Sequence, residues 1–549
     1  MHIVASSIPS GVRLTTVDDA GTPRESSDVP TSAFASEVAR RKHDRPRWVW
    51  DDTDRWYPSL LDAGVRVERC VDLRLSRAIL RSSPHTETTD VATAPHDPLD
   101  EPPGDGPTQR AADALFELEP VHGLPGVDPV EEFSRQRRAT PKALGLLLSA
   151  ESAGALVAAE IRHVGLPWRA DVHEELLVRE LGPRPRTGER PARMEALARD
   201  IRAALGAPDL NPDSAAAVLK ALRRAGLQVE STSKWELQRV EHPVVPFLLQ
   251  YKSLARLHSA NGWHWLDSNV REGRFHPDYV PGGVVTGRWA SRGGGGALQL
   301  PKQVRGAVLS DHGRVLVVAD AAQLEPRILA AMARDRGMVE AGAQGDLYAG
   351  IVERGAVATR QQAKLAMLGA MYGATQGESG RLMPSLARAY PRAIALVEAA
   401  ARAGERGERV STLLGRGSPL PGEEWRELQS LASAEGVAGA VQERARSAAR
   451  SWGRFTRNFV VQGTAAEWAL CWMAALRQRL HALDASANGP RLVFFLHDEL
   501  VIDAPDALAD EVSRAVAEAA SEAGRLLFGE LPIRFPLSVA IVKSYAEAK

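Results

Sequence analysis

The stretch that most constrains the fold is RVLVVADAAQLEPR, residues 314–327. Its apolar run, Val315 to Ala319, is rich in β-branched residues and predicts a strand buried on both faces. After Asp320 the apolar residues change to helical spacing, and Pro326 suits the first turn of a helix. Because a buried strand holds the residue at its end rigidly, Asp320 is a candidate metal ligand. The plainer alternative is that Asp320 caps the following helix.

A second stretch, RQQAKLAMLGAMYG (residues 360–373), carries four side chains at intervals of four residues: Arg360, Lys364, Leu368 and Tyr372. On an α-helix these positions cover roughly 120° of arc, so two cations and an aromatic ring share one face. Arginine and lysine one turn apart, with little acid nearby, suit a polyphosphate ligand. A solvated basic face is the plainer interpretation.

A third stretch, RLVFFLHDELVIDAP (residues 491–505), has two apolar runs on either side of His497, Asp498 and Glu499. This pattern predicts a β-hairpin with charged residues at its tip. An ordinary turn is the alternative interpretation. Asparagine or glycine would be more usual there, so the charged tip favours a functional role.

In this order and at these separations, the three stretches resemble motifs A, B and C of the family A (polymerase I-like) DNA polymerases. Motif A of that family is a metal-binding Asp followed by a Gln-hydrophobic-Glu run. Motif B is a helix with Arg, Lys, an aromatic residue and Tyr-Gly, and motif C is His-Asp-Glu on a hairpin. The matching residues are Asp320, Gln323 and Glu325 for motif A, Arg360, Lys364, Tyr372 and Gly373 for motif B, and His497, Asp498 and Glu499 for motif C.

The composition is that of an ordinary globular protein. The chain has 549 residues, 44% hydrophobic and 25% charged, which is enough for two to four domains. Its net charge of −1 means that any basic surface for nucleic acid must be local. The two cysteines, Cys70 and Cys471, predict neither a disulfide framework nor a zinc site. With no secretory signal, we expect a cytoplasmic, nucleoid-associated monomer without membrane association.

The resemblance implies an α+β right-hand polymerase fold of palm, fingers and thumb, preceded by a small, degraded RNase H-like exonuclease domain. The expected boundaries are 1–144 for the exonuclease-like domain and 145–549 for the polymerase domain. Within the latter we expect the thumb at about 145–273, the palm at about 274–335 and 453–549, and the fingers at about 336–452. Residues 82–110 are rich in Pro, Asp, Ser and Thr and predict a disordered segment.

The N-terminal domain is expected to be inactive as a 3′-5′ exonuclease. In the family, the first metal-binding pair is an Asp-x-Glu on an early strand, because this chemistry requires several carboxylates around two metal ions. The early strand identified here, GVRLTTVDDAG (residues 11–21), has no such pair. The alternative is a small α/β domain that only supports the rest of the chain. No 5′-nuclease domain is expected.

Polar residues that recur every four positions on one helix suggest a DNA-contacting stripe. Arg454, Asn458 and Gln462 have this spacing, within a run that resembles the family's Asn-x-x-x-Gln-Gly-Thr-Ala-Ala-Asp signature. A purely structural stripe is the alternative, but the small residues that follow favour close approach of nucleic acid. The DNA contacts that the resemblance implies are Thr286, Arg288, Gln299, Arg454, Asn458, Gln462, His497 and Glu499.

The resemblance also implies two-metal nucleotidyl transfer from dNTPs to the 3′ end of a primer on template DNA. Two Mg²⁺ ions, with Mn²⁺ as a substitute, would be held at Asp320, Asp498 and Ala321. Lys364 is the candidate acid that protonates the pyrophosphate leaving group. Glu325 would disfavour a ribonucleotide at the sugar. The expected nucleotide contacts are Arg360, Lys364, Tyr372, Gln323, Glu325, Leu368 and Tyr348.

Several departures from the family pattern surround the expected nucleotide pocket. Leu368 replaces the usual Phe or Tyr, Tyr348 replaces a His, and Ala321-Ala322 replaces the usual Tyr-Ser. We therefore expect weaker nucleotide binding or altered fidelity, in a polymerase for repair or specialised synthesis. Two other classes of function stay open. One is a DNA-binding protein with a polymerase fold and little turnover, and the other is a residual 3′-5′ exonuclease.

Overall fold

The computed structural model describes residues 1–101, 122–292, 300–343, 345–374 and 377–548. The predicted contact at Gln299 and the predicted disorder of residues 102–110 lie outside these ranges. The chain divides into two compact units. Unit 1 comprises Met1–Val164, Asp278–Arg292 and Val317–Ile541, and unit 2 comprises Gly165–Pro277, Gly293–Leu316 and Val542–Lys549.

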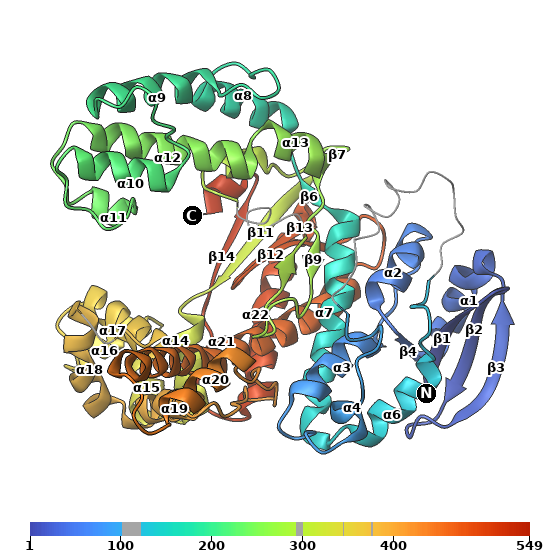
Figure 1. Ribbon diagram of the computed structural model, residues 1–549. Coiled ribbons are helices and arrows are strands. Elements are labelled where there is room, and N and C mark those ends of the chain that lie inside the picture. The colour runs from blue at the N-terminus through green and yellow to red at the C-terminus, as the bar shows by residue number, and fades with distance from the viewer. Residues whose placement is uncertain (102–121, 293–299, 344, 375–376, 549) are drawn as a thin grey trace. The chain divides into compact units, whose positions relative to one another are not determined.

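Unit 1 begins with a five-stranded sheet in the order β3-β2-β1-β4-β5 (Figure 1). The first three strands are antiparallel neighbours, and β4 and β5 run parallel to β1. The strands are β1 (His2–Ile8), β2 (Gly11–Val17), β3 (Pro23–Val29), β4 (Arg47–Trp50) and β5 (Cys70–Asp72). The helices around this sheet are α1 (Phe34–Arg40), α2 (Thr53–Asp62), α3 (Leu73–Ser82), α4 (Asp90–Thr93) and α6 (Pro129–Ala139).

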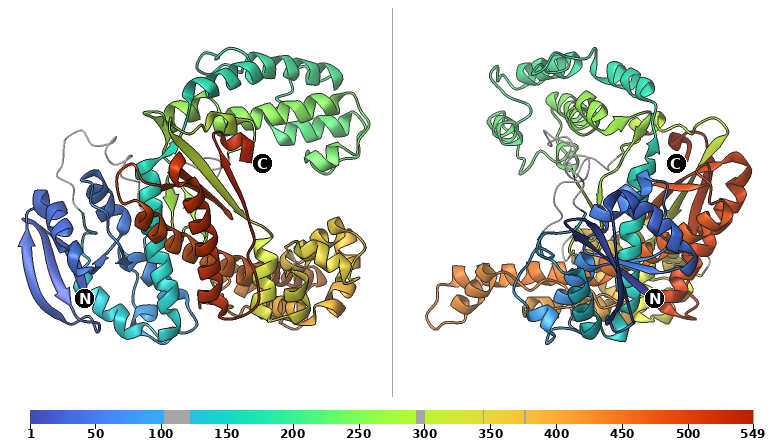
Figure 2. Two further views of the ribbon diagram at one scale, coloured as in Figure 1. Left: turned by 180° about the vertical axis from the view of Figure 1, so that it is seen from behind. Right: turned by 90° about the vertical axis from the view of Figure 1, so that its right-hand side faces the viewer.

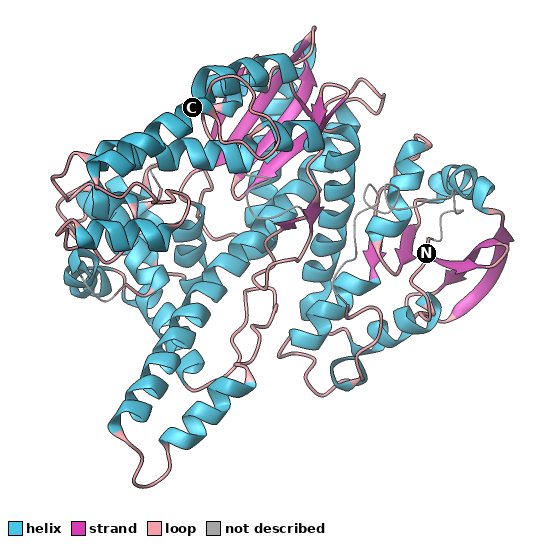
Figure 3. Ribbon diagram, turned by 45° about the horizontal axis from the view of Figure 1, so that its top comes forward, coloured by secondary structure: helices cyan, strands magenta, loops and turns pink. Residues whose placement is uncertain are grey.

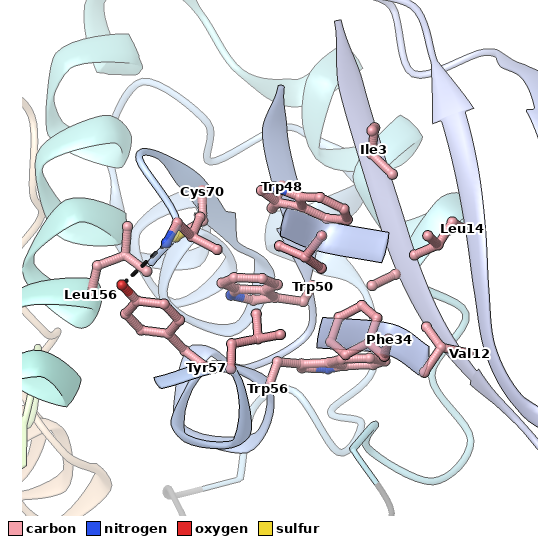
Figure 4. Close-up of a cluster of buried hydrophobic side chains, with 14 of the residues drawn as sticks. Ile3, Val12, Leu14, Phe34, Trp48, Trp50, Trp56, Tyr57, Cys70 and Leu156 are labelled. Atoms are coloured by element: carbon pink, nitrogen blue, oxygen red, sulfur yellow. Dashed lines mark hydrogen bonds between the residues drawn. The ribbon is translucent and has the colours of Figure 1, made fainter. Parts of the chain in front are cut away.

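Both faces of β1 are buried, because its alternating side chains enter two different clusters. Ile3 packs with Trp48 and Trp50 on one face, whereas Val4 packs in a second cluster on the other face. Figure 4 shows the first cluster, with the indole rings of Trp48 and Trp50 on β4 lying between side chains of β1 and β2 and Leu156. Each fully buried large side chain of this kind contributes about 1.5–3 kcal/mol, so the sheet has a substantial core of its own.

The predicted disorder of residues 82–101 is wrong. This segment contains α4, and Val91 and Leu99 are buried. The fully buried Arg77 guanidinium forms ion pairs with Asp97 at 2.7 Å and with Asp100 at 2.9 Å. The acidic residues that suggested disorder thus neutralise a buried cation, which is a tertiary interaction that low apolar content does not reveal.

Helix α7 (Gly145–Val164) corrects the predicted boundary of the thumb. Its contacts are with α2, β5, β12 and α21, so it belongs to unit 1. It is buried around most of its circumference, as its sequence predicts. Helix α7 and helix α21 (Gly439–Leu483) are each long and apolar enough to cross a membrane. However, 67% and 78% of their apolar windows are buried, as expected of core helices.

The central sheet of unit 1 has the order β12-β13-β11-β14. The strands are β11 (Arg314–Ala321), β12 (Arg491–Leu496), β13 (Glu499–Pro505) and β14 (Leu537–Val542). The predicted hairpin is confirmed, because β12 and β13 pair antiparallel with Leu496 opposite Glu499. Helix α21 packs against α22 (Ala509–Phe528) and α7 beside this sheet. Two short strands, β9 (Tyr279–Val280) and β10 (Ala290–Ser291), form a separate ladder.

Helices dominate the segment predicted as fingers. They are α15 (Arg336–Ala341), α16 (Leu347–Glu353), α17 (Arg360–Tyr372), α18 (Gly377–Ala389), α19 (Pro391–Glu405) and α20 (Glu423–Ala432), followed by the long α21; α14 (Leu324–Ala333) precedes them in the segment predicted as palm. In Figure 2 these helices are yellow to orange, and α20 and the start of α21 extend away from the rest of unit 1 as a helical hairpin. The prediction of a mostly helical segment is confirmed.

Unit 2 is mostly helical and corresponds to the predicted thumb, beginning at residue 165 instead of 145. Residues 293–316, predicted to be palm, belong to it as well. Its helices are α8 (Ala170–Leu181), α9 (Ala192–Ala204), α10 (Ala215–Arg224), α11 (Lys234–Leu237), α12 (Val244–Asn261) and α13 (Trp263–Asn269). The strands β6 (Leu166–Pro167), β8 (Arg274–Phe275) and β7 (Val270–Arg271) form its small sheet.

Candidate active site at the ends of strands β11 and β13

Asp320 occupies the position that the sequence predicts, near the end of the buried strand β11. The alternative that it caps the next helix is wrong. The residue preceding α14 is Gln323, with a φ of 55°, and no side chain caps this helix. Asp320 is half-buried between the apolar strand and the turn to α14. Its carboxylate is therefore positioned by a rigid strand and has no role in helix capping.

The tip of the β12–β13 hairpin carries Asp498. His497 precedes it with a φ of 58°, the left-handed conformation that is uncommon for a non-glycine residue. The Ala321 amide donates a hydrogen bond to the Asp498 carbonyl oxygen over 2.9 Å. Because β13 lies next to β11 in the sheet, the two carboxylate-bearing positions meet at one sheet end, as predicted. Residues 178 positions apart in sequence become neighbours in this way.

The donors at this sheet end suit a hard cation such as Mg²⁺, which prefers oxygen ligands. They are the carboxylates of Asp320 and Asp498 and the backbone carbonyl of Ala321. Within the described ranges, no group of three or more His, Cys, Asp or Glu side chains could hold a metal ion. The protein therefore offers a pair of carboxylates here, and further oxygen ligands would come from backbone, water or substrate.

Helix α17 presents its predicted face to solvent. Arg360, Lys364, Leu368 and Tyr372 are all exposed, whereas the intervening residues are mostly buried. Thr359 caps the helix start by accepting a hydrogen bond from the Gln362 amide, and Gly373 ends it with a φ of 72°. The structure thus places two cations and the Tyr372 ring along one face, as their spacing predicts.

Glu325 connects three of the predicted site segments. It accepts a hydrogen bond from the Arg288 guanidinium and another from the Tyr372 hydroxyl, the latter over 2.8 Å. Gln462 also hydrogen-bonds to Tyr372 and accepts one from Thr286 over 3.2 Å. Burial and the Glu325 charge raise the pKa of Tyr372 to about 12, so its hydroxyl stays a donor at neutral pH.

Asp346 organises a second group of predicted residues. It accepts hydrogen bonds from Gln323 and Arg360, both over 2.7 Å, and the Arg360 guanidinium lies 5.5 Å from the centre of the Tyr348 ring. Burial acts to raise the Asp346 pKa, but the bonds from Arg360 and Gln323 outweigh it and lower the pKa to about 2. Asp346 is therefore charged and holds Arg360, the predicted triphosphate ligand.

The predicted polar stripe lies on α21, where Arg454 is exposed and Asn458 and Gln462 are half-buried. Arg454 passes close to the end of α17, because a Cβ at Gly373 would lie 2.8 Å from its Cγ. Arg457 secures the two helices by donating to the Ala370 carbonyl over 2.6 Å. The stripe consequently runs beside the exposed face of α17.

A buried cluster behind the site was not predicted. Arg416 forms a buried ion pair with Glu151, and its guanidinium packs against Gly287 in the Thr286–Arg288 turn. The fully buried Glu467 accepts bonds from the Thr412 hydroxyl and the Leu414 amide. Burial raises the Glu467 pKa to about 7. Neither acid has a sequence pattern that reveals its partner.

The acidic residues of the N-terminal sheet have a different environment. The first strand of this sheet is β1, HIVASSI, not residues 11–21, and it has no carboxylate at all. Asp54 forms ion pairs with Arg162 at 2.8 Å and with Arg292 at 2.9 Å. The adjoining cavity is about 20 Å³, room for roughly one water molecule.

Asp52 and Asp72 complete this cluster. Asp52 forms an ion pair with Arg74 at 3.0 Å, and the Asp72 carboxylate accepts hydrogen bonds from the backbone amides of Thr53 and Leu75. Burial, with the nearby Asp52 charge, raises the Asp72 pKa to about 7. These acids are thus engaged by arginines and backbone amides.

In unit 1, two carboxylates lie at one end of a sheet, helix α17 bears Arg and Lys on one face, and α21 carries a polar stripe. The sequence profile of DNA polymerase family A matches residues 187–547, about two-thirds of the chain. The chain therefore belongs to DNA polymerase family A.

Individual relatives agree with this assignment. The thermostable DNA polymerase I of Thermus aquaticus is 28% identical over 353 residues, 58% of this chain and 38% of that protein. DNA polymerase I of Deinococcus radiodurans is 27% identical over 326 residues, 54% of this chain and 31% of that protein. The matched region thus spans under two-fifths of the length of these relatives.

Among solved structures, the chain resembles the POL domain of Pol1 from M. smegmatis, determined in complex with DNA primer-template and dNTP. The TM-score is 0.67 at 20% identity, with 100% of this chain and 95% of that chain covered. The whole described fold, including the N-terminal sheet, is therefore of a kind already seen with a polymerase. This likeness supports the predicted α+β polymerase fold.

Proposed function

We propose that this protein is a template-directed DNA polymerase that adds dNTPs to the 3′ end of a primer. The observation that carries the proposal is the meeting of Asp320, near the end of β11, and Asp498, in the turn before the neighbouring β13, through the hydrogen bond between Ala321 and the Asp498 carbonyl. Membership of family A and the fold support it. Bound at these carboxylates, two Mg²⁺ ions would activate the primer hydroxyl and stabilise the charge that develops on the transferred phosphate.

The described residues divide the remaining work between positioning and charge. Lys364 is on the same exposed face of α17 as Arg360 and would bind the triphosphate and protonate the leaving pyrophosphate. Arg360 is held by Asp346, so the triphosphate has to compete with this carboxylate for the guanidinium. Glu325, which Arg288 and Tyr372 hold by hydrogen bonds, would disfavour a ribose 2′-hydroxyl.

The nucleotide pocket suggests a specialised polymerase. Leu368 offers no aromatic ring to an incoming base, and aromatic stacking contributes about 1–3 kcal/mol per base in comparable contacts. Tyr348 stands where the family has a His, so no imidazole is present there to contact phosphate. The Tyr348 ring is instead buried beneath the Arg360 guanidinium. We therefore propose a role in DNA repair or specialised synthesis, and we propose separately that the protein acts in the cytoplasm as a monomer.

The decisive experiment is extension of a 5′-labelled primer on a DNA template with Mg²⁺ and all four dNTPs. The unaltered protein is compared with Asp320→Asn/Asp498→Asn. Extension by the unaltered protein alone is the expected result. Tight primer-template binding without extension would contradict the proposal and favour a DNA-binding protein. Primer shortening without dNTPs, retained in the double variant, would assign exonuclease activity to the N-terminal domain.

A further inference from the structure

The helical hairpin formed by α20 and the first turns of α21 stands apart from the core of unit 1. Figure 3 shows it as two helices extending away from the body, and Figure 2 shows it in orange. No residue of α20 is buried, and its Leu431 is 56% exposed. The described part of unit 1 therefore does not use this hairpin to build its core.

Charge is divided unevenly between the two helices. Helix α20 has three glutamates and one arginine, whereas residues 439–454 of α21 have one glutamate and four arginines. The two helices contact each other at Ala445, whose carbonyl accepts a hydrogen bond from Gln429. By helix geometry Arg450 lies roughly 140° around α21 from Ala445 and Arg454 roughly 180°, so both face away from α20.

The arginines continue the predicted DNA-contacting stripe outward. Arg446 and Arg450 precede Arg454, Asn458 and Gln462 at the same interval of four residues. From Gln462 to Arg446 the row is roughly 24 Å long at 1.5 Å per residue, and it winds roughly 160° around α21, as a strand crossing the helix obliquely would. Arg446 and Arg450 have side chains that are 63% and 52% exposed. A basic row of this kind suits a strand of phosphates.

One acid lies within this row. Glu443 pairs with Arg446 at 3.2 Å and with Arg450 at 2.8 Å, and all three side chains are mostly exposed. Exposed ion pairs are weak, about 0–1 kcal/mol, so a phosphate strand can displace the carboxylate from the arginines. Until then, Glu443 holds both guanidinium groups on the same side of α21.

We propose that Arg446 and Arg450 bind the single-stranded template beyond the nascent base pair. This inference rests on the proposed function and on placing Gln462 and Tyr372, which hydrogen-bond to each other, at that pair. From there the row runs along α21 into the fingers helices α19 and α20, away from the carboxylates on the sheet. Past the nascent pair a primer-template has only one strand, the unpaired template, so this strand is the occupant that the row fits.

The test is equilibrium binding of a labelled primer-template whose duplex is fixed and whose template overhang is either one nucleotide or about twelve, within the span that single-strand sites cover. The unaltered protein should bind the long overhang about tenfold more tightly. Arg446→Ala/Arg450→Ala should remove this gain and lower the slope of log K against log salt by about 1.4, since each single-strand phosphate contact contributes about 0.7. Affinity for the short overhang should change by less than about twofold.

Two control variants separate charge from fold. Arg446→Lys/Arg450→Lys should keep most of the gain, because lysine also contacts phosphate. Arg336→Ala/Arg426→Ala removes two exposed arginines from α15 and α20 and should leave the gain intact. If Arg446→Ala/Arg450→Ala loses affinity equally for both overhangs, or for neither, the inference is overturned. Primer extension by the unaltered protein would still support the polymerase in that case. Failure of the unaltered protein to bind any primer-template would overturn both proposals.

Discussion

Unit 1 contains two clusters of carboxylates at the ends of sheet strands, and they are treated in opposite ways. In the N-terminal sheet, Asp52 and Asp54 are paired with arginines at 2.8–3.0 Å, around a cavity of about 20 Å³. In the central sheet, Asp320 lies near the end of β11 and Asp498 in the turn before the neighbouring β13, and the exposed face of α17 carries two cations. The two clusters suggest that arginines surrounding a carboxylate can either neutralise it or, as proposed for α17, bind a substrate.

The largest expected difference between the clusters is in catalysis. Asp498→Asn should lower the rate of primer extension by at least about 1,000-fold, because it removes the charge that holds the catalytic cations. Asp72→Asn in the N-terminal cluster should change the rate by less than about twofold. Single-turnover extension of a labelled primer measures both rates. A comparable loss of extension rate in both variants would show that catalysis depends equally on the two clusters.

Stability should show the reverse pattern. Arg74→Ala leaves Asp52 without its guanidinium partner beside the buried Asp72 and should destabilise the fold by about 3–5 kcal/mol. Arg360→Ala, which removes an exposed partner of Asp346, should cost less than about 1 kcal/mol. Chemical denaturation monitored by tryptophan fluorescence gives both values. If the two variants lose similar stability, the N-terminal arginines are not holding their cluster together.

Glu467 is a buried acid that is accommodated by protonation, because the neutral carboxylic acid is less costly to bury than the carboxylate. Its folded pKa of about 7 lies above the ordinary value of 4.5, mainly because of burial. The contribution of Glu467 to the free energy of unfolding is therefore fully present below about pH 4.5. It is lost as the pH rises through 7, and the total loss is roughly 3 kcal/mol. Glu467→Gln should flatten this part of the stability profile between pH 5 and pH 8, measured by denaturation midpoints. An unchanged slope would show that Glu467 is ionised throughout.

The smallest expected effect concerns the nucleotide pocket beside the catalytic cluster. Leu368→Phe on the exposed face of α17 should add a stacking surface for the incoming base, worth about 1 kcal/mol, and lower the nucleotide KM about fivefold. Lys220→Ala in unit 2, also on an exposed helix face, is a control that should leave KM unchanged. Steady-state incorporation of a single dNTP is the measurement. An unaltered KM in Leu368→Phe would mean that Leu368 does not contact the base.

Local patterns predicted the elements of the catalytic cluster well. The β-branched run before Asp320, the four-residue spacing on α17 and the two apolar runs around Asp498 each report a structure formed by neighbouring residues. The prediction failed where the decisive partner is distant. The pattern around Asp97 and Asp100 predicts disorder because their partner, Arg77, is distant in sequence. The apolar surface of α7 does not reveal which elements it packs against, so the sequence assigns it to the thumb.

The sequence by itself determined the family, the three motifs and the order of strands and helices that carry them, because periodicity and chain order are local properties. Only the tertiary structure decided which charges meet: Glu325 with Arg288 and Tyr372, Arg360 with Asp346, and Arg416 with Glu151. These partners lie between 14 and 265 positions apart. Pairing over such separations depends on how whole elements pack, which no local pattern records.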